Sequence, residues 1–292
     1  MRVKRARFAP INYSSMKSAY AIVLVLFSGP VFCQQPGFRG FATAGDKPVL
    51  FAPGVVSTAA DEFAPSFTPD GKTVYFSGDG QKIYFSRLAG GKWSKPEVAS
   101  FSGKWKDMDS FISPDGKRLF FASYRPPEGA AEDQPFQNAH IWYVDLVSDG
   151  RWSAPHHIDG PVNPEGVNNY APSVSASGTL FFFSPGRDSR YKRKSYYAKW
   201  LGNHYDEPKP LLLNDAEVKD VYTAPDERYL LFTSGKDIYI SYRQGEEWGS
   251  GQKLGASVNH GLANASPYVS PDGKWLFYSI EGTPGISMMK IN

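Results

Sequence analysis

Five stretches of the chain repeat one pattern of polar and apolar positions. Each contains a polar turn, which in three copies reads Ser/Thr-Pro-Asp-Gly. A run of apolar residues follows the turn. The copies span residues 64–77, 109–122, 171–184, 220–233 and 266–279. The turn prolines or their equivalents lie at 69, 114, 176, 225 and 271, so the spacings are 45, 62, 49 and 46 residues. Periods of about 40 to 50 residues with several strands each are typical of propeller blades.

The run after each turn is apolar at consecutive positions, as in Val74-Tyr75-Phe76. A strand with one solvated face would alternate, so each run predicts a middle strand that neighbours cover on both sides. We expect an aromatic column in the core, made of Phe76, Phe121, Phe183, Phe232 and Tyr278. A third strand follows each run, and an outer strand is expected to begin near Trp93, Trp152, Tyr205 and Trp248.

The fifth copy ends after its third strand, and its outer strand is found at the other end of the chain. Residues 47–56 align with residues 154–163, which form the outer strand of the second copy. The sequence therefore predicts an all-β, five-bladed β-propeller that is closed by pairing the N-terminal strand with the last blade. Such closure removes an open sheet edge.

The repeat S-P-D-G-K-x-L-x-F-x-S, followed by I-Y-x-S and W-S-x-P, resembles the WD-like propeller repeats of the TolB family of bacterial envelope proteins. The resemblance covers residues 47–292. It implies the fold and leaves function open, because TolB-like propellers dock protein partners in the periplasm while similar repeats occur in lyases and in the propeller half of prolyl oligopeptidase-like enzymes. The chain lacks the Gly-x-Ser-x-Gly of those peptidases.

The N-terminus reads as a secretory signal. Basic residues precede an apolar run from Ala19 to Phe27 that is too short for a membrane span. We expect a signal peptide at 1–33, a linker at 34–45 and the propeller at 46–292, with either Met1 or Met16 as the true start. The product would be a periplasmic or secreted protein without a membrane span.

Charge and motifs narrow the function classes. The net charge of +3 includes five basic residues of the signal, so the mature chain carries about −2 and we expect no nucleic-acid partner. Cys33 is the only cysteine, and no zinc, phosphate-loop or dinucleotide motif is present. We therefore expect no metal and no cofactor. His156 and His157 are adjacent on a strand and point to opposite faces, so they cannot chelate one metal together.

Aligning the repeats on their turns predicts two polar rings on one face of the propeller. The outer ring holds Glu62, Asp107, Asn169, Val218 and Asn264. The inner ring, two residues further into the channel, holds Ala64, Asp109, Ala171, Asp220 and Ser266. Arg125 and Arg187 follow equivalent middle strands on the same face and could pair with these acids or clamp a carboxylate.

From these rings we predict a ligand-binding face made of Glu62, Asp107, Asp109, Arg125, Asn169, Arg187, Asp220 and Asn264. The favoured function is a non-catalytic, monomeric binding module for an envelope protein or a glycan. The alternative is a glycan-active enzyme, a glycosidase or lyase, that uses carboxylates in the central funnel. A water-filled channel whose acids are only solvated is the third interpretation.

Overall fold

The computed structural model describes residues 47–130, 134–213 and 217–291. The expected signal peptide (1–33) and linker (34–45) lie outside the described residues. Within them the chain forms 22 β-strands and two short 3-10 helices, Ser148–Gly150 and Gly160–Val162. The fold is all-β, and none of the helices in the described ranges is long and apolar enough to cross a membrane.

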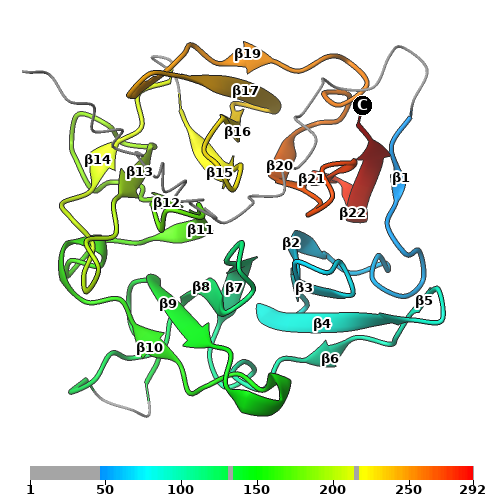
Figure 1. Cartoon of the computed structure of the whole chain (residues 1–292), viewed down its shortest axis with the longest axis horizontal. Coiled ribbons are helices and arrows are strands. Elements are labelled where there is room, and N and C mark those ends of the chain that lie inside the picture. The colour runs from blue at the N-terminus through cyan, green and yellow to red at the C-terminus, as the bar shows by residue number, and fades with distance from the viewer. Residues whose placement is uncertain (1–46, 131–133, 214–216, 292) are drawn as a thin grey trace, which may run out of the picture. The chain divides into compact units, whose positions relative to one another are not determined.

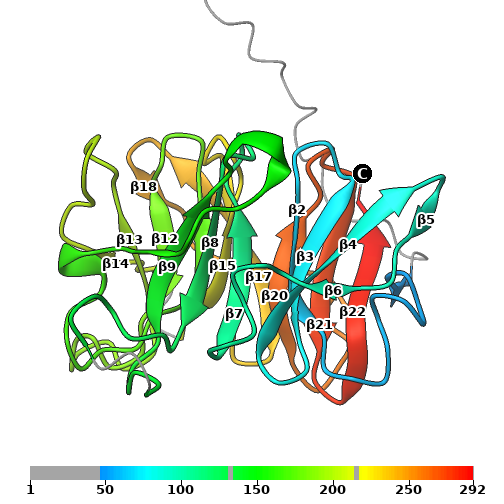
Figure 2. The ribbon, with the colours of Figure 1, turned by 90° about the horizontal axis from the view of Figure 1, so that it is seen from below.

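The strands form five antiparallel sheets around a central axis, and these sheets are the blades of a propeller (Figure 1). Seen from the side, the strands run between two faces on which loops connect them (Figure 2).

Each blade has an innermost, a second, a third and an outer strand. Blade 1 contains β2 (Phe63–Phe67), β3 (Thr73–Gly78), β4 (Lys82–Ala89) and β6 (Glu97–Val98). Blade 2 contains β7 (Asp107–Ile112), β8 (Arg118–Ser123), β9 (His140–Asp145) and β10 (His156–His157). Blade 3 contains β11 (Tyr170–Val174), β12 (Leu180–Phe183), β13 (Ser195–Ala198) and β14 (Lys209–Pro210). Blade 4 contains β15 (Lys219–Thr223), β16 (Tyr229–Ser234), β17 (Asp237–Gln244) and β19 (Gln252–Lys253). Blade 5 contains β20 (Asn264–Val269), β21 (Trp275–Ile280), β22 (Thr283–Lys290) and β1 (Val49–Leu50).

The tryptophan segments expected to begin the outer strands pair with the end of the third strand before the outer strand proper. They form β5 (Lys92–Trp93) on β4 and β18 (Glu247–Trp248) on β17. The outer strands β6 and β19 pair further back along the same third strands.

The predicted closure is confirmed. β1 pairs antiparallel with β22, with Val49 opposite Met288. The N–H of Phe51 donates to the carbonyl of Ile286 at 2.8 Å, and the Phe51 ring packs edge-on against Phe277 with centroids 5.2 Å apart. The first and last described strands therefore complete one sheet, which fixes the number of blades at five.

The aromatic column is buried as expected, with one correction of register in blade 3. Phe121 lies two residues before Ser123 and opposite Trp142, whereas in blade 3 the residue two before Ser184 is Phe182, opposite Tyr196. Blade 3 has one residue fewer between its turn and this serine. Phe182 therefore takes the place that the repeat alignment assigned to Phe183.

The turns between the first two strands have a common geometry. In blade 2 the N–H of Gly116 donates to Ser113 at 2.8 Å, and Gly116 has a φ of +73°. The turn of blade 4 has no glycine, and Glu227 adopts the left-handed conformation there with a φ of +55°. Its N–H still donates to Ala224 at 2.9 Å, so the turn closes in the same way.

Candidate functional site

All five innermost strands carry an irregularity at the same place. Their pairing with the second strand shifts register next to the inner-ring residue of each repeat. These residues have left-handed φ values between +46° and +56°: Ala64, Asp109, Ala171, Asp220 and Ser266. Left-handed conformations are costly for residues other than glycine, and bulges of this kind re-aim side chains. The predicted inner ring is thus a ring of strained backbone around the axis.

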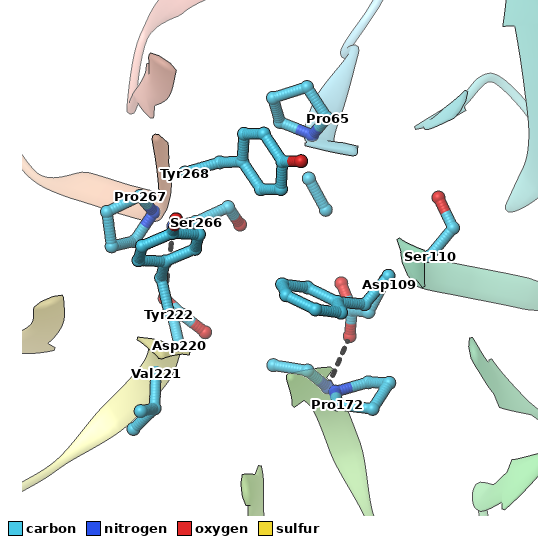
Figure 3. Close-up of a pocket in the computed structure, with 13 residues that line it drawn as sticks. Pro65, Asp109, Ser110, Pro172, Asp220, Val221, Tyr222, Ser266, Pro267 and Tyr268 are labelled. Atoms are coloured by element: carbon cyan, nitrogen blue, oxygen red, sulfur yellow. Dashed lines mark hydrogen bonds between the residues drawn. The ribbon is translucent and has the colours of Figure 1, made fainter. Parts of the chain in front are cut away.

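The five inner-ring residues line one small cavity on the axis (Figure 3). Its volume is about 40 Å³. Three aromatic side chains also line it and contact one another, with ring centroids 5.3 Å apart for Tyr222 and Tyr268 and 6.0 Å apart for Phe111 and Tyr268. Since small-molecule pockets usually measure about 300 to 1,000 Å³, this cavity has room for a few waters and not for a sugar ring.

Asp109 and Asp220 are the two acids of this cavity, and they lie on different sides of it (Figure 3). Burial and, secondly, the charge of Asp220 raise the pKa of Asp109 to about 7, although a hydrogen bond from the N–H of Ala171 at 3.0 Å opposes the rise. Burial also raises the pKa of Asp220, although Lys219, Thr233 and Ser266 act in the opposite direction. The two acids therefore disfavour each other's ionisation, as desolvated carboxylates in one cavity should.

The polar residues of the outer ring are buried and do not line this cavity. Each bonds to the loop that leads into its own blade. Asn169 donates to the carbonyl of Val162 at 3.1 Å, Asn264 donates to Oδ1 of Asn259 at 3.4 Å, and Glu62 accepts from the N–H of Thr58 at 3.1 Å. Asn264 also donates to the carbonyl of Lys236 in the preceding blade at 3.0 Å. Val218 is fully buried. The side chains of the two predicted rings therefore have different surroundings.

The two arginines are engaged with the outer ring and not with the inner acids. Arg125 forms a buried ion pair with Asp107 at 2.8 Å, and Asp107 also accepts from Ser102 and Ser123. Arg187 donates to Asn169 at 3.1 Å. Both guanidinium groups bind groups of the protein itself. The sequence alone could not show whether they would bind such internal groups or a ligand.

A second, larger cavity of about 400 Å³ opens at blade 1, between the segment that follows β1 and the strands β3 and β4. Glu62 is the predicted site residue that lines it. Its other walls include the aromatic side chains Phe76, Tyr84 and Trp93, with Asp79 and Lys95. Its size falls within the range of ligand pockets. Nothing in the repeat pattern indicated a cavity here, because it arises where two distant segments meet.

The structure also contains a polar chain that sequence reasoning missed. His140 Nδ1 and His157 Nε2 are 2.9 Å apart, and His157 Nδ1 lies 2.7 Å from Asp159. Burial, followed by the charges of His157 and Arg187, lowers the pKa of His140 to about 4. His156 lies on the other face of the strand, stacked on Tyr143. The described residues contain no group of three or more His, Cys, Asp and Glu side chains placed to hold a metal ion.

No family model matches the chain, and no curated protein sequence matches it. Solved structures do match. A candidate TolB from Agrobacterium tumefaciens is 18% identical, with a TM-score of 0.51, over 76% of this chain and 70% of that one.

Two further matches cover most of both chains. A candidate gluconolactonase is 15% identical, with a TM-score of 0.50, over 88% of this chain and 96% of that one. A protein of unknown function from Dyadobacter fermentans is 13% identical, with a TM-score of 0.50, over 87% of this chain and 100% of that one. At such low identities the likeness concerns the fold alone. The shared feature is the β-propeller.

Proposed function

We propose that the protein is a non-catalytic binding module of the periplasm or the secreted fraction, which docks a protein or glycan partner. Its binding surface is the loop face, defined here as the face formed by the loops before the innermost strands and after the second strands. The observation that carries the proposal is the 400 Å³ cavity at blade 1. Its lining residues Thr58, Ala60 and Glu62 precede β2 and Gly78 and Asp79 end or follow β3, so the cavity belongs to that face.

The lining of this cavity supports binding. Pockets that bind ligands combine apolar and aromatic walls with a few placed polar groups. Here Phe76 and Tyr84 stack at 6.0 Å with 22° between their planes, and the carboxylate of Glu62 is held by Thr58 beside them. The wall is therefore preformed, which lowers the entropic cost of binding.

A role for Asp109 and Asp220 belongs to the same proposal. The inner acids lie on the axis at the centre of the five blades, where a bound partner could supply further hydrogen bonds or a cation to the two desolvated carboxylates. Replacing both with alanine should abolish partner binding and leave the fold intact. Partner binding that persists in the folded double variant would remove the inner acids from the site.

The second candidate is a glycan-active enzyme that uses these same acids. It is favoured by the pKa of about 7 of Asp109, since an acid of that kind beside a second carboxylate is the pattern of a general acid and base. One of the solved structures with a similar fold is also named as a gluconolactonase. The 40 Å³ volume argues against it, because a sugar ring could not reach both acids without rearrangement.

One experiment separates the two functions. The chain from Gln34 is incubated with a panel of oligosaccharides and with lactones, and release of reducing ends and lactone opening are followed beside the Asp109→Asn variant. Turnover that disappears in that variant would replace the binding proposal with the enzymatic one. In parallel, a pull-down from periplasmic extract with wild type and the Asp109→Ala/Asp220→Ala variant should yield a partner that only wild type retains.

A further inference from the structure

Blades 2 and 3 each enclose an arginine at one equivalent place. In blade 2 the Nε of Arg125 donates to Ser123 at 2.9 Å, and its Nη2 donates to Asp107 at 2.8 Å and to the carbonyl of Phe101 at 3.0 Å. The guanidinium lies over the rings of Phe121 and Trp142, 4.9 and 5.4 Å from their centroids. It is thus held by a hydroxyl, an outer-ring side chain, a loop carbonyl and an aromatic pair.

Arg187 repeats this set in blade 3. Its Nε donates to Ser184 at 2.9 Å, and its Nη2 donates to Asn169 at 3.1 Å and to the carbonyl of Val162. The guanidinium lies over Phe182 and Tyr196 at 5.2 and 5.4 Å. Two blades therefore build the same guanidinium site from equivalent positions, although the arginine comes two residues after the serine in one and three in the other.

Blade 1 has the aromatic pair and the outer-ring acid of this site, but Gly78 stands in the place of Ser123 and there is no arginine. Phe76 pairs with Tyr84 in β3 and β4 as Phe121 pairs with Trp142 in β8 and β9, and Glu62 takes the outer-ring position of Asp107. Ser57 accepts from the N–H of Ile286 at 3.0 Å as Ser102 accepts from that of Ile83 at 3.1 Å. This aligns the two loops and makes Val56 the counterpart of Phe101.

In blade 1 no side chain occupies the position that the guanidinium takes in blades 2 and 3. After Ser77 the chain reads Gly78-Asp79-Gly80, and the cavity of about 400 Å³ lies there, lined by Val56, Glu62, Phe76 and Tyr84. Only 5% of the surface of Glu62 is exposed, and within the described part of the chain its carboxylate accepts hydrogen bonds from the N–H and hydroxyl of Thr58. A buried carboxylate without a cation is costly unless a ligand compensates it.

We infer that the blade 1 cavity binds a guanidinium group, as an arginine side chain of a protein partner. This inference rests on the proposed binding role and names its ligand chemistry. The guanidinium would stack on Phe76 and Tyr84 and donate to Glu62 and the Val56 carbonyl, as the internal arginines do in their own blades. Asp79 adds a second acid at the cavity, and Lys95 is exposed beside it, so the charged lining is acidic overall. The room beyond the guanidinium, towards Trp93 and Pro96, suits the aliphatic stem of an arginine and the neighbouring backbone.

The test uses a blocked five-residue peptide, Gly-Gly-Arg-Gly-Gly, its lysine counterpart and methylguanidinium, titrated by calorimetry and by NMR against the chain from Gln34. We expect saturable binding of the arginine peptide at least tenfold tighter than of the lysine peptide. Glu62→Gln should weaken it at least tenfold, whereas Glu97→Gln, an exposed acid of β6 in the same blade, should leave it unchanged. Methylguanidinium bound as tightly as the peptide would confirm the guanidinium site and assign it to a free small molecule.

A second variant, expected to fill the cavity and stabilise the fold, keeps the test valid if another variant fails to fold. By the strand pairing Gly78 takes the place of Ser123, so Gly80 takes the place of Arg125. Gly80 has a left-handed backbone with a φ of +69°, and the neighbouring Asp79 lines the cavity. Asp79→Arg should therefore place an internal guanidinium in the cavity, raise the melting temperature and eliminate peptide binding. Equal binding of the arginine and lysine peptides, or no binding by a folded wild type, would overturn the inference. If the pull-down still yields a partner in the latter case, the proposed function stands without it.

Discussion

The carboxylate of Asp109 in blade 2 accepts a hydrogen bond from the backbone N–H of Ala171 in blade 3 at 3.0 Å. The two residues hold the same position of their repeats and both have left-handed backbones. Asp220 makes the corresponding contact to the N–H of Ser266 in blade 5 at 3.5 Å. Each inner acid therefore ties its own blade to the next one at the axis, in addition to facing the cavity.

This arrangement predicts a pH dependence of stability. The pKa of Asp109 is about 7 in the folded protein, against about 3.9 in an unfolded chain. Between these values the folded state keeps a proton that the unfolded state releases, so the free energy of unfolding falls as pH rises through this window. Asp109→Asn removes the titration and should stabilise by roughly 1–2 kcal/mol at pH 8, since Asp109 is only partly buried and solvent screens part of the effect.

The measurement compares thermal melts of wild type and Asp109→Asn at pH 4 and pH 8. The difference between the proteins isolates Asp109, because His140, whose pKa is lowered to about 4, titrates over the same range in both. We expect equal melting temperatures at pH 4 and a higher one for the variant at pH 8. A variant less stable than wild type at pH 8 would contradict the raised pKa.

Closure of the ring predicts a large effect of one side chain. Phe51 is 5% exposed and packs edge-on against Phe67, Trp93 and Phe277 between the last and first blades. Phe51→Ala should cost about 3 to 5 kcal/mol, and a chain that starts at Glu62 should aggregate because a sheet edge is opened. Val49→Ala, in β1 just before Phe51 but 55% exposed, should stay within about 0.5 kcal/mol in denaturant unfolding.

The ion pair of Arg125 and Asp107 predicts an asymmetric response to substitution. Asp107 is completely buried, so Arg125→Ala leaves a carboxylate without its cation and should destabilise by about 3 to 5 kcal/mol. A double variant, Asp107→Asn/Arg125→Met, should recover much of that loss. Arg190→Ala breaks an exposed pair with Asp188 and should cost at most about 1 kcal/mol, so equal losses in the two arginine variants would refute the structural role.

The left-handed backbone of the inner ring predicts that glycine is tolerated at these strand positions, although glycine inside a strand is usually destabilising. Ala64 has a φ of +49°, and relief of this conformation offsets the entropic cost of glycine, so Ala64→Gly should be neutral or stabilise by up to about 1 kcal/mol. Ala122→Gly, in the interior of β8, should lose about 1 kcal/mol or more. A loss at position 64 as large as that at 122, measured by denaturant unfolding, would argue against the strain.

The repeat was sufficient to predict the blades because its signals are local. A Pro-Asp-Gly turn constrains backbone angles within four residues, and an unbroken apolar run such as Leu230-Leu231-Phe232 can be satisfied only by cover on both faces. The same logic located Asp109 and Asp220 on the axis, because their distance from the turn sets their height in the channel. Their mutual effect on ionisation follows from that placement.

Side-chain partners were decided by the tertiary structure. Sequence alignment placed Arg125 and Arg187 on one face with the inner acids, but the direction in which a long flexible side chain folds depends on which loop carbonyl and aromatic ring it meets. Those partners come from the preceding blade's outer segment, Phe101 for Arg125 and Pro161 for Arg187. The pairing of His140 with His157 across β9 and β10 likewise depends on strand register, which the repeat did not specify.

The amino-acid sequence by itself determined the number of blades, the closure through residues 47–56 and the two acids at the axis, since each follows from short-range turn chemistry and a fixed period. Only the tertiary structure decided that the axial cavity is small, that the outer ring is bonded to its own loops, and that a ligand-sized cavity lies at blade 1. Cavities and side-chain contacts arise where segments far apart in the chain pack together. The volume of a cavity is small compared with that of the packed side chains around it. One glycine in place of an arginine therefore decides whether a blade is filled or open.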